Sequence, residues 1–162
     1  MRMSARMVLI VSIGLIAGTA FPALAQPKPK PAAQSQPTRK EPHRVVIQIT
    51  QNDPAVMNMA LNNAENMVRY YEGKGEKVDI EFVAYGPGLF MVRNDTSPVK
   101  DRLASIAARN KSVTVSGCEN TMNAQSAAEH KEIALVPTVQ TVSTGIGRIV
   151  ELQERGWIYV RP

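Results

Sequence analysis

Short apolar runs alternate with longer amphipathic segments along residues 43–162. The runs are rich in β-branched and aromatic residues, and Gly, Pro or polar residues bound each of them, which is typical of strands in a sheet. This pattern predicts strands over residues 44–50, 77–85, 113–116, 139–142 and 157–160.

The segments between these runs carry apolar residues at helical spacing. The first segment places Met57, Leu61, Ala64, Val68 and Tyr71 on one face, which we expect to be buried. We predict helices over residues 54–72, 98–110, 120–129 and 146–155, and a short helical turn over 89–92.

Two of the predicted helices begin with the same signal, a polar residue followed by proline. Asp53 precedes Pro54, and Ser97 precedes Pro98. Asp and Ser are preferred N-cap residues, and proline is favoured at the first helical position. We therefore expect these helices to begin at the two prolines.

The order of the elements predicts the fold class. Strands and helices alternate from the first predicted strand to the fifth, which is typical of an α/β fold with right-handed crossovers. We expect residues 43–162 to form a three-layer α/β/α sandwich around a mostly parallel five-stranded sheet.

The residues before this domain predict an exported protein. Residues 1–25 combine Arg2 and Arg6 with a short apolar segment and end in Ala-Leu-Ala, as a cleavable secretory signal does. Residues 26–42 are rich in Pro, Lys and Arg and poor in apolar residues, which favours a disordered tether. We expect cleavage after Ala25, export to the periplasm and no membrane span in the mature chain, because the apolar segment is shorter than the ~20 residues a spanning helix needs.

The net charge of +5 comes from these ends. The signal and the tether hold six of the 19 Lys and Arg residues but only one of the 14 Asp and Glu residues, so the domain itself is balanced. The domain sequence also lacks a basic stripe with interleaved aromatic residues. We therefore expect no nucleic-acid partner.

Cys118, the one cysteine of the chain, follows the third predicted strand. Gly117 turns the chain there, and the helix over 120–129 begins directly after the thiol. Free N–H groups at a helix N-terminus lower the pKa of a thiol, whereas the carboxylate of Glu119 would raise it if it faced the sulfur. Two interpretations remain open: a reactive nucleophile, or a small buried hydrophobic residue.

The carboxyl ends of parallel strands meet at one edge of a sheet, where α/β proteins gather their binding sites. The loops predicted at this edge are rich in glycine and amide side chains. The candidate substrate-binding residues beside Cys118 are Gln51, Asn52, Gly86, Gly88, Gly117 and Asn120.

The sequence lacks the common metal and nucleotide signatures. No His, Cys and Asp cluster has metal-ligand spacing, no Walker loop occurs, and Gly145-Ile-Gly147 lacks the third glycine of a dinucleotide site. His130 falls in a polar stretch at the far end of the helix over 120–129, which argues against a Cys-His hydrolase. We expect no metal and no cofactor.

Several stretches together resemble the DsrE/DsrF-like family, which includes the YchN-like proteins. They are residues 45–49 with the following Gln-Asn-Asp, 83–88 (Val-Ala-Tyr-Gly-Pro-Gly), 115–122 (Val-Ser-Gly-Cys-Glu-Asn-Thr-Met) and 147–162. The resemblance implies an α/β domain that assembles into trimers or hexamers. In sulfur-relay members a cysteine after the third strand carries sulfur as a persulfide, and Cys118 matches that position. Those members work in the cytoplasm, whereas this chain carries an export signal.

Two functional hypotheses follow. In the first, the protein is a sulfur carrier or sulfurtransferase-like protein that exchanges sulfur between a donor and an acceptor protein through Cys118. In the second, it is a non-catalytic oligomeric module that binds a partner or senses redox state, with Cys118 packed or sensing.

Overall fold

A computed structural model describes residues 41–162, and the predicted signal over 1–25 and nearly all of the tether over 26–42 lie outside the described residues. Five strands form one sheet in the order β4-β3-β2-β1-β5, and every neighbouring pair is parallel. The strands are β1 (His43–Ile49), β2 (Val78–Ala84), β3 (Val113–Cys118), β4 (Gln140–Val142) and β5 (Ile158–Val160).

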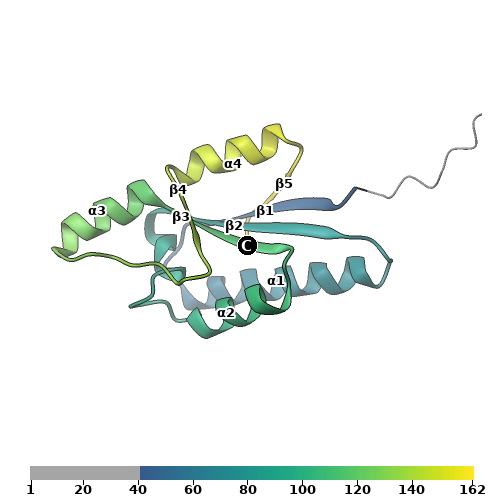
Figure 1. The fold of residues 1–162 in the computed structure, drawn as a ribbon, viewed down its shortest axis with the longest axis horizontal. Helices are drawn as coiled ribbons and strands as arrows, with labels where there is room; N and C mark the ends of the chain where they lie inside the picture. The colour runs from purple at the N-terminus through teal and green to yellow at the C-terminus, as the bar shows by residue number, and fades with distance from the viewer. Residues whose placement is uncertain (1–40) are drawn as a thin grey trace, which may run out of the picture. The chain divides into compact units, whose positions relative to one another are not determined.

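Helices cover both faces of this sheet. α1 and α2 lie on one face and α4 on the other, while α3 projects beyond the carboxyl edge of the strands (Figure 1). The helices are α1 (Pro54–Glu72), α2 (Lys100–Arg109), α3 (Glu119–Glu129) and α4 (Gly145–Glu154), and a 3₁₀ helix, η1 (Gly86–Met91), follows β2. The three-layer α/β/α prediction is confirmed, with a sheet that is parallel throughout.

Alternation along β3 decides which face each side chain occupies, because successive strand residues point to opposite faces. Val113 and Val115 join the large core beneath α1 and α2. Ser116 instead contacts Glu81, which is held by Arg148 of α4. Cys118 has the parity of Ser116, so the thiol lies on the α4 face of the sheet. β3 is two residues longer than predicted and ends at this cysteine.

The predicted start of α1 is confirmed. The Asp53 side chain accepts a hydrogen bond from the Ala55 N–H at 2.7 Å, and Pro54 is the first helical residue. Met57, Leu61 and Ala64 are fully buried, as their spacing predicts.

The predicted start of α2 at Pro98 is wrong, because the helix begins at Lys100. The Ser97 hydroxyl donates to the Met91 carbonyl at 2.5 Å and accepts from the Val99 N–H at 3.3 Å. Ser97 therefore ties the turn before α2 to the end of η1 rather than capping a helix at Pro98.

The apolar run at residues 89–92 forms the predicted helical turn, η1, but it is not a surface feature. Leu89, Met91 and Val92 are all 0% exposed in the single chain, and only Phe90 is partly exposed. A single chain therefore covers nearly all of this apolar run, and the run gives no support to oligomerisation.

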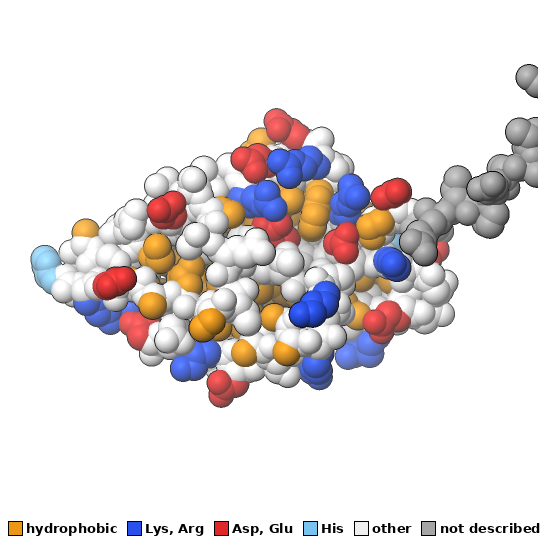
Figure 2. Space-filling view, in the orientation of Figure 1, with side chains coloured by type: hydrophobic (Ala, Val, Ile, Leu, Met, Phe, Trp, Pro, Cys, Tyr) orange, Lys and Arg blue, Asp and Glu red, His pale blue; other side chains and the backbone are white. Residues whose placement is uncertain are grey.

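The surface of the described domain mixes charges of both signs. On the face shown in Figure 2, Lys and Arg side chains lie among Asp and Glu side chains and scattered apolar groups. Within residues 41–162, no helix has the length and apolar character that crossing a membrane requires.

Candidate functional site

Cys118 lies where two helices begin. It ends β3 and is the N-cap residue of α3, with φ −74° and ψ 117°. It also pairs with Val142 of β4, three residues before Gly145, the first residue of α4. The first N–H groups of a helix have no partner within the helix. The sulfur is therefore near the first N–H groups of both α3 and α4.

These donors set the ionisation of the thiol. Burial raises the pKa of Cys118, and only 4% of the residue is exposed. The Thr121 hydroxyl and the backbone N–H groups of Thr121, Gly145 and Asn120 donate toward the sulfur and lower the pKa. The donors prevail, so the pKa lies below its ordinary value, which confirms the predicted direction. Glu119, whose carboxylate would raise the pKa of the thiol if it faced the sulfur, is exposed on the first turn of α3.

Gly86 is bound to α3 through both groups of its backbone. Its N–H donates to the Thr121 hydroxyl oxygen at 3.0 Å, and its carbonyl accepts from the Gln125 side chain at 3.2 Å. Gly86 has φ +55°, a left-handed conformation that glycine adopts without strain. The candidate residue Gly86 thus contacts the thiol site through Thr121.

Gly145 brings α4 to the sulfur because it has no side chain. A Cβ on this buried residue would lie 2.7 Å from the Tyr85 ring, inside any normal contact distance. Tyr85 is fixed in turn, since its hydroxyl accepts from the Gln48 amide, which also accepts from the Tyr159 hydroxyl. The close approach of Gly145 and Tyr85 thus holds the first turn of α4 beside Cys118.

A buried ion pair secures α4 one turn further on. Glu81 is 4% exposed and accepts both the Nε and Nη2 groups of Arg148 at 2.8 Å. Ser116, two residues before Cys118 on the same face, donates to Glu81 at 2.7 Å. A charge with its hydrogen bonds satisfied is tolerated at this depth. The ion pair therefore fixes α4, whose N-terminus faces the thiol, against the sheet.

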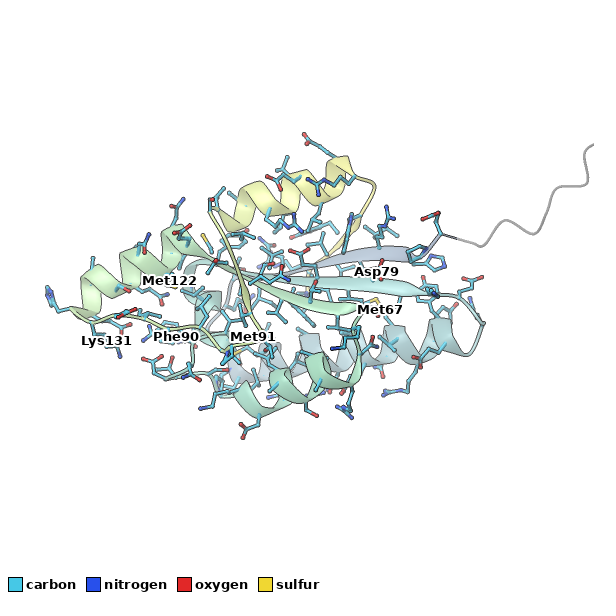
Figure 3. The ribbon with its side chains drawn as sticks, viewed as in Figure 1. Met67, Asp79, Phe90, Met91, Met122 and Lys131 are labelled. Carbon is cyan, nitrogen blue, oxygen red and sulfur yellow. The ribbon has the colours of Figure 1, made fainter. Side chains whose placement is uncertain are left out.

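A shallow groove of about 550 Å³ runs along η1 and the inner side of α3. Three candidate residues, Asn52, Gly86 and Asn120, line it, and Thr121 connects it to the thiol. The other lining residues are mostly apolar: Pro87, Phe90, Ala124, Gln125 and Ala128. In Figure 3, Met122 belongs to α3, and Phe90 lies below this helix.

The remaining candidate residues lie outside the groove. Gln51 is exposed and does not line it. Gly88 packs so tightly on β1 that an added Cβ would lie 2.2 Å from the Ile49 carbonyl oxygen. An added Cβ on Gly117 would lie 2.7 Å from a methyl group of Leu135. The two glycines are therefore packing positions that let the carboxyl edge close.

The outer end of α3 is held by a buried guanidinium that the sequence did not reveal. Arg93 is 0% exposed and forms paired hydrogen bonds to both Asp95 and Glu129. Its guanidinium carbon lies 4.7 Å from the centre of the Phe90 ring. Lys131, labelled toward the C-terminal end of α3 in Figure 3, adds a second cation to the two carboxylates. Since α3 has no fully buried residue, this cluster is a main anchor of the helix.

Among the described residues, neither a histidine nor a metal-ligand cluster accompanies the thiol. His130 is the exposed C-cap of α3, at the opposite end of the helix from Cys118, which is roughly 18 Å at 1.5 Å per residue. Among residues 41–162, no group of three or more His, Cys, Asp or Glu side chains is placed to hold a metal ion.

Comparison with known proteins finds relatives of this fold among solved structures. No family model and no curated protein matches the sequence significantly. Among solved structures, the chain is similar to MTH1491 from Methanobacterium thermoautotrophicum, a protein of unknown function. The two share 31% sequence identity and a TM-score of 0.63 over 74% of this chain and 99% of the archaeal one. The chain belongs to the family of MTH1491. Because MTH1491 is of unknown function, this likeness supports the fold, and an activity has to be argued from the site.

Proposed function

We propose that the protein is a thiol-based sulfur carrier of the DsrE/DsrF-like kind, with Cys118 as its persulfide site. The observation that carries this proposal is the set of donors at the sulfur, which outweighs the effect of burial on the thiol pKa. A thiolate is both the nucleophile that accepts sulfur and the leaving group that releases it. A cysteine that merely fills the core has no need of such donors.

The sulfur chemistry balances with two thiol partners. The Cys118 thiolate attacks the outer sulfur of a donor persulfide, R–S–S⁻. The donor S–S bond breaks, its electron pair leaves on the donor as RS⁻, and Cys118 holds the outer sulfur as Sγ–S⁻. An acceptor thiolate then attacks that outer sulfur after it has gained a proton, and the electron pair of the Sγ–S bond returns to Cys118. No oxidant or cofactor enters, because sulfur moves between thiols.

The groove beside Thr121 gives the partner a place to dock. Its lining is apolar apart from a few amides and backbone groups, including Asn52 and Asn120. A donor or acceptor protein could insert a cysteine-bearing loop there and reach the sulfur past Thr121. The loops at residues 51–52 and 86–88 shape this end of the domain.

The test is sulfur loading of the mature protein. The purified protein is incubated with an inorganic polysulfide, and intact-mass spectrometry follows additions of whole sulfur atoms that a reducing agent removes. We expect such additions on the wild type and none on Cys118→Ser, whose circular dichroism and melting curve match those of the wild type. An unmodified thiol that also resists alkylation in the folded protein would contradict the proposal.

A non-catalytic binding or redox-sensing module is the second candidate, favoured by the 4% exposure of Cys118. In that case, polysulfide leaves the protein unloaded, while a mild oxidant changes its partner binding or assembly. The loading experiment therefore separates the two candidates.

We also propose export to the periplasm and assembly into a homo-oligomer, a trimer or hexamer. The sequence of residues 1–25 supports export. Large apolar side chains that a single chain leaves exposed on the neighbouring elements α4 and β5 support assembly. They are Ile146, Val150 and Ile158.

A further inference from the structure

We propose that Thr121 is a catalytic residue that stabilises Cys118 Sγ as the leaving group when sulfur is handed on. The inference rests on the proposed sulfur-carrier function. The Thr121 hydroxyl is expected to accelerate the release of sulfur from Cys118 and not the capture of sulfur by Cys118.

The position of Thr121 follows from the helix start. Cys118 is the N-cap of α3, so Thr121 is its third helical residue, and a side chain there turns back over the cap. Thr121 also lines the groove, which places it between the sulfur and the surface from which a partner approaches.

The orientation of the hydroxyl is fixed by its acceptor role. Gly86 N–H donates to Thr121 Oγ1 at 3.0 Å, and Gln125 holds the other side of the Gly86 backbone. A hydroxyl that accepts from a fixed N–H directs its own proton elsewhere. The acceptor for that proton is the Cys118 thiol, to which the Thr121 side chain is hydrogen-bonded. The order Gly86 N–H, Thr121 O–H, Cys118 Sγ is then a short chain of aligned hydrogen bonds, in which each bond polarises the next.

The direction of catalysis follows from where charge develops. During release, the acceptor thiolate attacks the outer sulfur, the Sγ–S bond breaks, and the electron pair accumulates on Sγ, where the hydroxyl donates. During capture, the same hydrogen bond stabilises the attacking thiolate and reduces its nucleophilicity. Removing the hydroxyl should therefore slow release and leave capture unchanged or faster, once the pH is high enough to ionise the thiol in every variant.

The experiment compares Thr121→Val, which keeps the shape and loses the hydroxyl, with Thr121→Ser, which restores it. The matched control is Thr114→Val, because Thr114 is a part-buried threonine on β3 whose hydroxyl donates to the Ile80 carbonyl. The thiolate is titrated by its ultraviolet absorbance, with the Cys118→Ser protein as the blank, so that no reagent has to enter the site.

We expect the titration midpoint of Thr121→Val to rise and the thiolate population at neutral pH to fall about tenfold, as the loss of a hydrogen bond to a charged group implies. Thr121→Ser should retain most of the wild-type midpoint, and Thr114→Val should not move it. An unchanged midpoint in Thr121→Val would overturn the role of Thr121.

The sulfur readout uses polysulfide for capture and dithiothreitol as the acceptor for release. Release from loaded Thr121→Val should be about tenfold slower than from the wild type, with capture unimpaired at alkaline pH. Equal slowing of both steps would reduce Thr121 to a structural residue. Failure of every variant to load would overturn the sulfur-carrier function, while the titration would still decide whether Thr121 controls the thiol.

Discussion

The buried guanidinium of Arg93 gives a sharp test of how α3 is held. We consider Arg93→Met, which keeps an apolar chain against Phe90 and removes the charge and five hydrogen bonds, to Asp95, Gln125 and Glu129. Removing one partner of a fully buried ion pair costs about 3–5 kcal/mol. Here the side chains of Asp95 and Glu129 are 39% and 32% exposed, so water partly replaces the lost cation. We expect the free energy of unfolding to fall by about 2–3 kcal/mol.

Urea denaturation followed by the fluorescence of Trp157 measures this loss. With a slope of about 1–3 kcal/mol per molar urea, the midpoint should fall by on the order of 1 M. Lys131→Met is the matched control, because Lys131 contacts the same two carboxylates from an exposed position and should matter far less. Hydrogen exchange should show faster opening of α3 than of β1–β3 in Arg93→Met. Equal midpoints for the two variants, or unaltered exchange in α3, would refute the anchoring role of Arg93.

Four further predictions follow. Gly88→Ala should destabilise the fold by about 3 kcal/mol or more, because its Cβ would lie 2.2 Å from the Ile49 carbonyl oxygen, whereas Gly73→Ala, with 3.4 Å to its nearest neighbour, should be tolerated in the same thermal melt. Acid should weaken the α3 anchor, because Arg93 lowers the pKa of Glu129 from 4.5 to about 2. The ionised Glu129 therefore stabilises the fold fully above pH 4.5, and this stabilisation is lost as the pH falls toward 2. A free energy of unfolding that stays constant between these pH values would contradict this. N-terminal sequencing of the natural protein should show cleavage after Ala25, and a mature chain that keeps the first 25 residues would contradict export. Light scattering at micromolar concentration should give the mass of a trimer or hexamer, and a monomer mass would exclude assembly.

The sequence predicted helices and strands correctly where residues within one turn or strand determine them. The periodicity of 54–72 and the Asp53 cap correctly predicted α1, because both depend on residues within one helical turn. Ser97 and Pro98 gave the same signal, yet Ser97 bonds to Met91 in η1, and this contact moves the helix start to Lys100. A cap pattern gives no warning when a tertiary partner competes for the side chain.

The site was predictable in part for the same reason. Cys118 and the lowered pKa of its thiol follow from a strand that runs directly into a helix. Thr121 carries a sequence signal of its own, since it stands three residues after the cap, where a side chain can turn back toward the cap residue. The sequence also places Gly145 at this edge, after the fourth predicted strand. Its position at the sulfur depends on the pairing of β3 with β4, which places Val142 beside Cys118.

The position of β5 has a consequence for how the chain is made. β1 is the second strand from one edge of the sheet, and its outer neighbour is β5, which pairs Ile158 with Val45. Synthesis therefore produces β1 long before the strand that covers it. During that interval, one backbone edge of β1, a run of Val and Ile, is open to any strand from another chain. A chain still being synthesised thus exposes an aggregation hazard at β1. Substitutions that weaken β5 should therefore lower the yield of soluble protein more than the stability of protein already folded.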